Sequence, residues 1–122
     1  MNARQTALLS GGVLGFLAVG MGAMGAHHLA LSESESRAWS TAVDYQMWHA
    51  ILLLVVALSP FSASRTFPYL IASFVAGIVL FSGSIYLLVL TKNSLWGPIT
   101  PLGGICILLG WFLVILSAWL HR

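Results

Sequence analysis

Charged side chains are scarce in this chain. Its 122 residues include five Lys or Arg and three Asp or Glu, so that 7% are charged while 59% are hydrophobic. A soluble domain usually carries about 25% charged residues. A chain with so few charges cannot cover itself with a wetted surface. This excludes an ordinary soluble domain and favours the lipid bilayer as the solvent.

Cysteine is nearly absent, and the few basic residues are scattered. Cys106 is the single cysteine, which excludes an intrachain disulfide and a zinc site of the Cys/His type. The scattered basic residues form no patch that would bind nucleic acid. No glycine-rich loop of the phosphate-binding kind is found. We therefore expect no cofactor, no metal and no nucleic-acid partner.

Long apolar runs, by contrast, fill most of the chain. They predict an all-α integral membrane four-helix bundle with up-down-up-down topology and both termini on the same side. We expect a single transmembrane domain over residues 1–122, with spans at about 6–26, 41–59, 70–90 and 102–120. The first run, with Arg4 before it, also suits a secretory signal peptide. We expect an uncleaved first span.

Local signals place several boundaries. Ser32 and Glu35 are spaced as a capping box, so the second helix should begin at about residue 33, before it enters lipid. Thr100 and Pro101 suit the cap and the first residue of the fourth helix. Trp39 falls near an expected membrane interface, where aromatic belts lie.

Small residues recur on single faces of the expected helices. Their spacing lets a neighbouring helix approach closely, so that packing contacts replace the hydrophobic drive that is missing in lipid. The residues that we assign to helix packing are Gly11, Gly15, Ala18, Gly22, Gly25, Gly77, Gly103 and Gly110.

The basic residues indicate an orientation. Arg4, Arg65 and Arg122 would share the side of the termini, whereas Arg37 and Lys92 would lie on the other side. The positive-inside rule therefore places the termini in the cytoplasm.

A polar segment, residues 44–49, interrupts the second span, and each of its buried groups needs a partner. On antiparallel neighbours, depth matching sets His49 level with Ser82 and Tyr45 level with Tyr86. We expect a polar pocket in the outer half of the bilayer above an apolar inner half. Its residues would be His27, Asp44, Tyr45, Gln46, His49, Ser82, Ser84, Tyr86 and Thr100.

Two of these residues allow alternatives. His49 either clamps the second and third helices by a hydrogen bond near Ser82, or binds a ligand, a proton or a metal. Asp44 should form an ion pair with Arg37 or Lys92 near the headgroups.

Metal and catalytic interpretations are weaker. Met21, Met24 and His28 share a helix face and are ligand types that suit copper, but flexible methionine packing explains the pattern as well. Ser82 or Ser84 beside His49 would make a nucleophile pair. No acidic residue is placed to orient the histidine, so we expect no enzyme.

Four motifs occur in order along the chain: residues 22–27 (GAMGAH), 45–49 (YQMWH), 80–86 (LFSGSIY) and 100–104 (TPLGG), the last followed by Gly110-Trp111. With these motifs the chain resembles the YgdD/YwdK family of small bacterial inner-membrane proteins of unknown function, which has small mitochondrial relatives in animals. Met24 stands where the family usually has an aromatic residue, and Asp44 where its members often carry glutamate. The resemblance implies four transmembrane helices in the bacterial cytoplasmic (inner) membrane, and it names no catalytic residue.

Two functions follow as hypotheses. The first is a non-enzymatic binding or accessory factor that is surrounded by membrane lipids. Its pocket would hold a hydrophobic ligand, such as a lipid or a quinone-like molecule, or a helix of a partner membrane protein. The second is a small transporter or channel that acts as a homo-oligomer. The inner half supplies no ionisable side chain for a continuous ion path, which favours the first.

Overall fold

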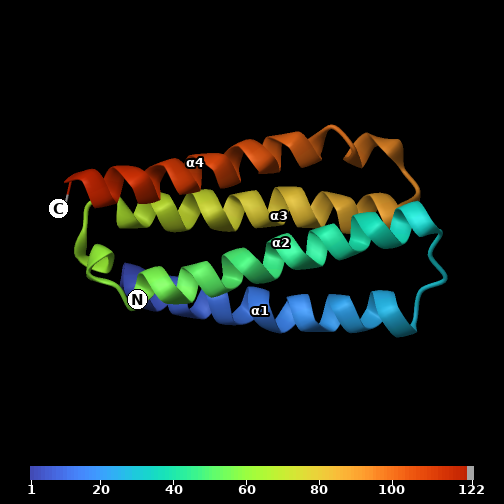
Figure 1. The fold of residues 1–122 in the computed structure, drawn as a ribbon, viewed down its shortest axis with the longest axis horizontal. Coiled ribbons are helices and arrows are strands. Elements are labelled where there is room, and N and C mark those ends of the chain that lie inside the picture. Colours follow the sequence, from blue (N-terminus) through green and yellow to red (C-terminus); the bar gives the residue numbers. More distant parts are fainter. Residues whose placement is uncertain (121–122) are drawn as a thin grey trace.

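Four antiparallel helices make up the computed structural model, which describes residues 1–120 (Figure 1). They are α1 (Ala3–His27), α2 (Glu33–Ala57), α3 (Phe67–Thr91) and α4 (Ile99–Leu120), with short 3-10 turns η1 (Pro60–Ala63) and η2 (Ser94–Trp96) between them. The start of α1 and the end of α4 lie at the same end of the bundle. The predicted all-α four-helix bundle is confirmed. We call the opposite end, with the α1–α2 and α3–α4 connections, the far end.

All four helices are long and apolar enough to cross a membrane. The first three have 25 residues each and α4 has 22. At 1.5 Å per residue this is about 33–38 Å, which exceeds the hydrocarbon core of about 30 Å. Each helix therefore has ends that reach the interface. Arg122, which the orientation argument counts beside the termini, lies outside the described residues.

The starts of α2 and α4 show how local signals compete with tertiary contacts. The Ser32 hydroxyl accepts from the Glu35 amide at 3.2 Å, and the Glu35 carboxylate accepts from the Ser32 amide at 3.0 Å, so the predicted capping box is confirmed. The cap predicted at Thr100 is wrong, because α4 begins at Ile99. The Thr100 hydroxyl instead hydrogen-bonds the Ser84 hydroxyl of α3 at 2.5 Å.

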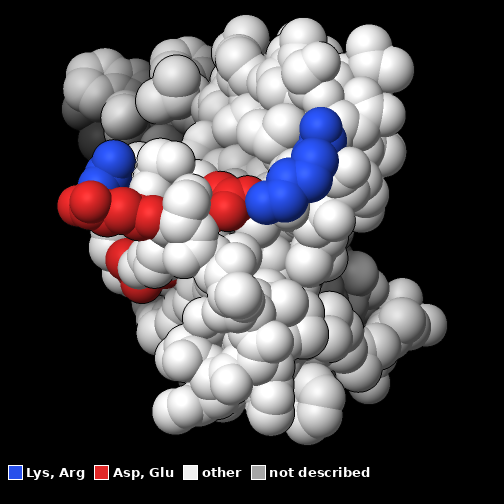
Figure 2. Space-filling view, turned by 90° about the vertical axis from the view of Figure 1, so that its right-hand side faces the viewer, with Lys and Arg blue, Asp and Glu red and all other residues white. Residues whose placement is uncertain are grey.

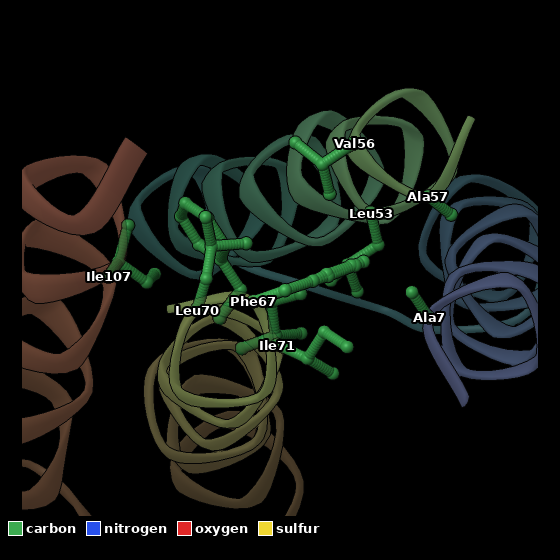
Figure 3. Close-up of a cluster of buried hydrophobic side chains, with 10 residues drawn as sticks. Ala7, Leu53, Val56, Ala57, Phe67, Leu70, Ile71 and Ile107 are labelled. Atoms are coloured by element: carbon green, nitrogen blue, oxygen red, sulfur yellow. The ribbon is translucent and has the colours of Figure 1, made fainter. Parts of the chain in front are cut away.

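The helices lie side by side in chain order, with α2 and α3 as the central pair (Figure 1). The main hydrophobic cluster forms where these two helices meet near the termini, around Leu53, Phe67 and Leu70. Ala7 of α1 and Ile107 of α4 enter this cluster from opposite sides (Figure 3). Because α1 packs mainly on α2 and α4 mainly on α3, α2 and α4 make few direct contacts.

Close approach of α1 and α2 depends on glycine. A Cβ at Gly11 would lie 2.9 Å from the Ala50 carbonyl oxygen, and a Cβ at Gly25 would overlap the Trp39 indole. The other small residues of this face are Gly15 and Gly22, which are half-buried, and Ala18, which is fully buried.

The contact between α3 and α4 is equally close. A Cβ at Gly77 would lie 2.6 Å from the Ile107 side chain, and a Cβ at Gly110 would lie 2.6 Å from the Phe74 ring. A Cβ at Gly103 would overlap the backbone of α3 itself. These positions admit no side chain while the two helices stay where they are.

The far end carries charges of both signs, which gather on one part of the surface in Figure 2. Arg37 pairs with Glu33 at 3.1 Å, and Lys92 pairs with Glu35, which joins the start of α2 to the end of α3. The expected ion pair of Asp44 with Arg37 or Lys92 is therefore wrong. Both cations lie nearer the membrane surface, where the acidic residues of the first turn of α2 reach them.

Candidate functional site

The nine polar residues that the sequence places in one pocket do not surround a common cavity. The structure divides most of them among separate contacts between helices and leaves His27 and Asp44 exposed. Gln46 of α2 makes the largest of these: its amide donates to the Leu14 carbonyl oxygen of α1 at 2.8 Å and accepts from the Tyr86 hydroxyl of α3 at 2.7 Å. Gln46 and Tyr86 are buried. One side chain thus joins three helices, which explains its polarity without any ligand.

The contact between α2 and α3 follows a register different from the expected one. The Ser82 hydroxyl donates to the Ala42 carbonyl oxygen at 2.7 Å, and no hydrogen bond joins Ser82 to His49 within residues 1–120. The predicted match is wrong by about seven residues, or about two turns. Depth matching assumes that α2 enters lipid at about residue 41, whereas Glu35, in the first turn of α2, already pairs with Lys92 directly after α3.

His49 is bound at both ring nitrogens. Its Nδ1 donates to the Tyr45 carbonyl oxygen at 2.7 Å, because a carbonyl only accepts, and its Nε2 accepts from the Trp111 indole N–H at 3.0 Å. This arrangement requires a neutral imidazole. The predicted clamp to α3 is wrong: His49 joins α2 to α4. With both nitrogens occupied, His49 offers no free base or metal ligand in this arrangement.

We expect His49→Leu to lower the free energy of unfolding by about 0.6–2 kcal/mol, because one interhelical hydrogen bond in lipid is lost. Trp111→Phe removes the same bond from its other side. The double variant should therefore cost less than the sum of the two single variants in detergent unfolding experiments. Full additivity would show that the two side chains do not interact.

An apolar groove of about 740 Å³ lies between α2 and α4, and Phe81 of α3 contributes to its lining. Gly104 of α4 lines this space without a side chain, and a Cβ there would meet nothing within 4 Å. We call it the α2–α4 groove. It is lined by Tyr45, Trp48, His49, Phe81, Pro101, Gly104, Ile105, Ile107, Leu108 and Trp111.

Aromatic rings form the wall and floor of the α2–α4 groove. The Tyr45 ring lies 4.7 Å from the Phe81 ring and 5.3 Å from the Trp48 ring, and the Trp111 ring stands edge-on to His49 at 5.8 Å. Such tilted and edge-to-face pairs are the favoured geometries for aromatic rings. At the mouth, 58% of Trp48 and 69% of Leu108 are exposed, so the groove opens sideways toward lipid.

Of the nine predicted pocket residues, only Tyr45 and His49 line this groove. Ser84 and Thr100 bind each other between α3 and α4. His27 is exposed in the last turn of α1, at the far end. Asp44 is exposed on the outside of α2.

The metal and catalytic interpretations find little geometric support. Within residues 1–120 no three His, Cys, Asp or Glu side chains converge on a point that could hold a metal ion. Met21 and Met24 pack against the buried cluster around Trp39 and Tyr86. The hydroxyls of Ser82 and Ser84 bind a backbone carbonyl oxygen or Thr100 rather than His49.

Two tryptophans occupy positions that sequence reasoning missed. Trp39 is 3% exposed because it packs between helices, and its indole donates to the Met21 carbonyl oxygen at 2.7 Å. Gly25, which leaves room for this indole, is the one sequence signal for its burial. The partnership of Trp111 with His49 has no such signal, because the two residues are 62 positions apart.

Comparisons with known proteins agree with the fold. Residues 21–104 match the family model described as "Protein of unknown function (DUF423)". The chain is 41% identical over 118 residues to the UPF0382 membrane protein YwdK of Bacillus subtilis (strain 168), covering 91% of this chain and 94% of that protein. It is 36% identical over 114 residues to the UPF0382 inner membrane protein YgdD of Escherichia coli (strain K12), covering 91% and 87%. No solved structure matches the chain.

Proposed function

The chain belongs to the DUF423 (UPF0382) family of membrane proteins of unknown function, and on this premise we propose that it is a non-enzymatic binding factor of the bacterial inner membrane. Its ligand is a hydrophobic molecule that enters the α2–α4 groove sideways from the bilayer. The observation that carries the proposal is the groove itself, an apolar volume of about 740 Å³ with aromatic walls. Ligand pockets commonly have about 300–1,000 Å³ and such linings.

The state of the polar groups also supports binding rather than chemistry. His49 has both nitrogens occupied, and Gln46 is used in helix contacts. The Tyr45 hydroxyl makes no hydrogen bond within the described part of the chain, so it is free to orient a ligand in the groove. A bound lipid chain or quinone-like ring would pack against the aromatic side chains that line the groove.

Gly104→Leu tests this proposal, because Gly104 lines the groove and a Cβ there meets nothing within 4 Å, so the added side chain has room to occupy the ligand's space. We expect native mass spectrometry of gently extracted protein to show a bound small molecule on the wild type and not on Gly104→Leu. Gly20→Leu is the matched control, since Gly20 is exposed on α1 and a Cβ there also meets nothing within 4 Å. The same bound mass on Gly104→Leu would overturn the proposal.

A liposome flux assay separates binding from transport. Between His49 and the end of the termini, the bundle is filled by the apolar cluster around Leu53 and Phe74. This cluster offers no groups that could replace the hydration shell of an ion. Purified protein should therefore pass no protons or small ions above background. A robust flux that His49→Ala abolishes would overturn the binding proposal in favour of a small transporter.

A further inference from the structure

The hydrogen bond between His49 and Trp111 ties the two walls of the α2–α4 groove together. His49 lies on α2 and Trp111 on α4, and both side chains line the groove. The indole N–H donates to the imidazole Nε2 at 3.0 Å. Because α2 and α4 make few direct contacts, this bond does much to hold the walls at their present separation. We call it the groove latch.

The groove latch exists only while the His49 imidazole is neutral. An indole nitrogen only donates, and a backbone carbonyl oxygen only accepts. Trp111 therefore requires a lone pair on Nε2, and the Tyr45 carbonyl oxygen, 2.7 Å from Nδ1, requires the ring proton on Nδ1. A proton from solvent that binds Nε2 uses up this lone pair. Two N–H groups then face each other, and the groove latch is lost.

No charged group around His49 compensates for such a proton. The rings beside it are Tyr45 on its own helix, Phe74 of α3 and Trp111 of α4. Of these only Tyr45 is titratable, and a phenol loses its proton only in alkaline solution. At this level α1 brings glycines toward α2, which have no side chain to titrate. Asp44, the one carboxylate nearby on α2, lies about 140° round the helix and is exposed on its outside.

From this geometry we propose that the groove holds its ligand tightly only while the groove latch is closed, so that acidification releases the ligand. The inference rests on the proposed function and adds its regulation by protons. Loss of the latch lets Trp111, which is 44% exposed, turn toward lipid and open one wall. The imidazolium left in the other wall is a poor surface for an apolar molecule. Both effects weaken binding.

The pH dependence has a fixed sign. The closed, ligand-bound form carries one proton fewer on His49 than the open form, so ligand affinity is highest in neutral or alkaline solution and falls as the pH drops. A single proton changes a binding constant by at most about tenfold per pH unit.

The test is equilibrium binding of triphenylmethane, a neutral probe without titratable groups, to the full-length protein in a non-ionic detergent at pH 8 and at pH 5. We expect the wild type to bind about tenfold more weakly, or weaker still, at pH 5. His49→Gln offers an amide oxygen as acceptor but cannot take up a proton, so its affinity should be the same at both pH values. His27→Gln removes an exposed histidine in the last turn of α1 and is the matched control, which should keep the wild-type response.

A second measurement reads the groove latch directly. In protein with isotopically labelled tryptophan, the indole N–H signal of Trp111 is identified in the NMR spectrum by its absence from Trp111→Phe. We expect this signal to shift between pH 8 and pH 5 in the wild type and to stay in place in His49→Gln. An unchanged signal in the wild type would overturn the inference, even if His49→Gln does not fold.

The outcomes separate the two proposals. If Gly104→Leu reduces probe binding at pH 8 while the wild type binds equally well at both pH values, the regulation by protons fails and the binding groove stands. If the wild type shows no probe binding that Gly104→Leu removes, the groove is not the site, and both proposals fail. If His49→Gln keeps the pH response of the wild type, another group senses the proton, and the inference is overturned.

Discussion

Gly103→Leu is expected to leave little folded protein. A Cβ at residue 103 would lie 2.7 Å from the Leu80 carbonyl carbon and would overlap the Phe81 amide nitrogen, and both belong to the backbone of α3. A side chain can turn away from such a clash, but a helix backbone cannot. The two helices must separate, which also exposes the buried Ile107 and Phe74. We expect a loss of about 3 kcal/mol or more, at or beyond the upper end for overpacked cores.

The measurement is the yield of monodisperse protein followed by thermal unfolding in one detergent. Gly104→Leu is the control, because it adds the same side chain one residue later, where a Cβ meets nothing within 4 Å. Gly104→Leu should unfold at a temperature close to that of the wild type. If the two variants unfold at similar temperatures, α3 and α4 are not closely packed at Gly103.

The second large effect is expected at Gln46. Gln46→Leu removes the hydrogen bonds to the Leu14 carbonyl oxygen and the Tyr86 hydroxyl, and it leaves that hydroxyl buried without its acceptor. Interhelical hydrogen bonds in membranes average about 0.6 kcal/mol and reach about 1.7 kcal/mol. We therefore expect a loss of about 1–3 kcal/mol in detergent unfolding, with the unpaired hydroxyl adding to it.

Tyr86→Phe gives the matched test of this network. In the double variant both partners are gone, so no buried hydroxyl is left without an acceptor. Its loss should be smaller than the sum of the two single losses by about 0.5 kcal/mol or more. Strict additivity would contradict the hydrogen bond between Gln46 and Tyr86.

The candidate site was predictable only in part. The motif around Tyr45 and His49 could be recognised in the sequence because polar residues are conspicuous in an apolar helix. Their partners could not be recognised. An error of seven residues in the relative depth of α2 and α3 assigns His49 to Ser82, which in the structure bonds Ala42. The groove had no sequence signal of its own, since most of its lining is ordinary apolar residues of α4. Asp44 was noticed, but its expected partners turned out to be engaged by Glu33 and Glu35.

The sequence alone determined the properties that depend on a short stretch of chain. The four apolar runs, the capping box at Ser32 and the small-residue faces of α1 and α4 follow from composition and spacing. Tertiary structure decided the position of each helix along its axis, and its rotation about that axis, relative to the next helix. In lipid, an apolar helix has no strongly preferred face, because lipid chains solvate every side about equally well. Only close contacts, such as Gly103 on the α3 backbone and Gln46 between three helices, select one register, and the α2–α4 groove is the space that this register leaves.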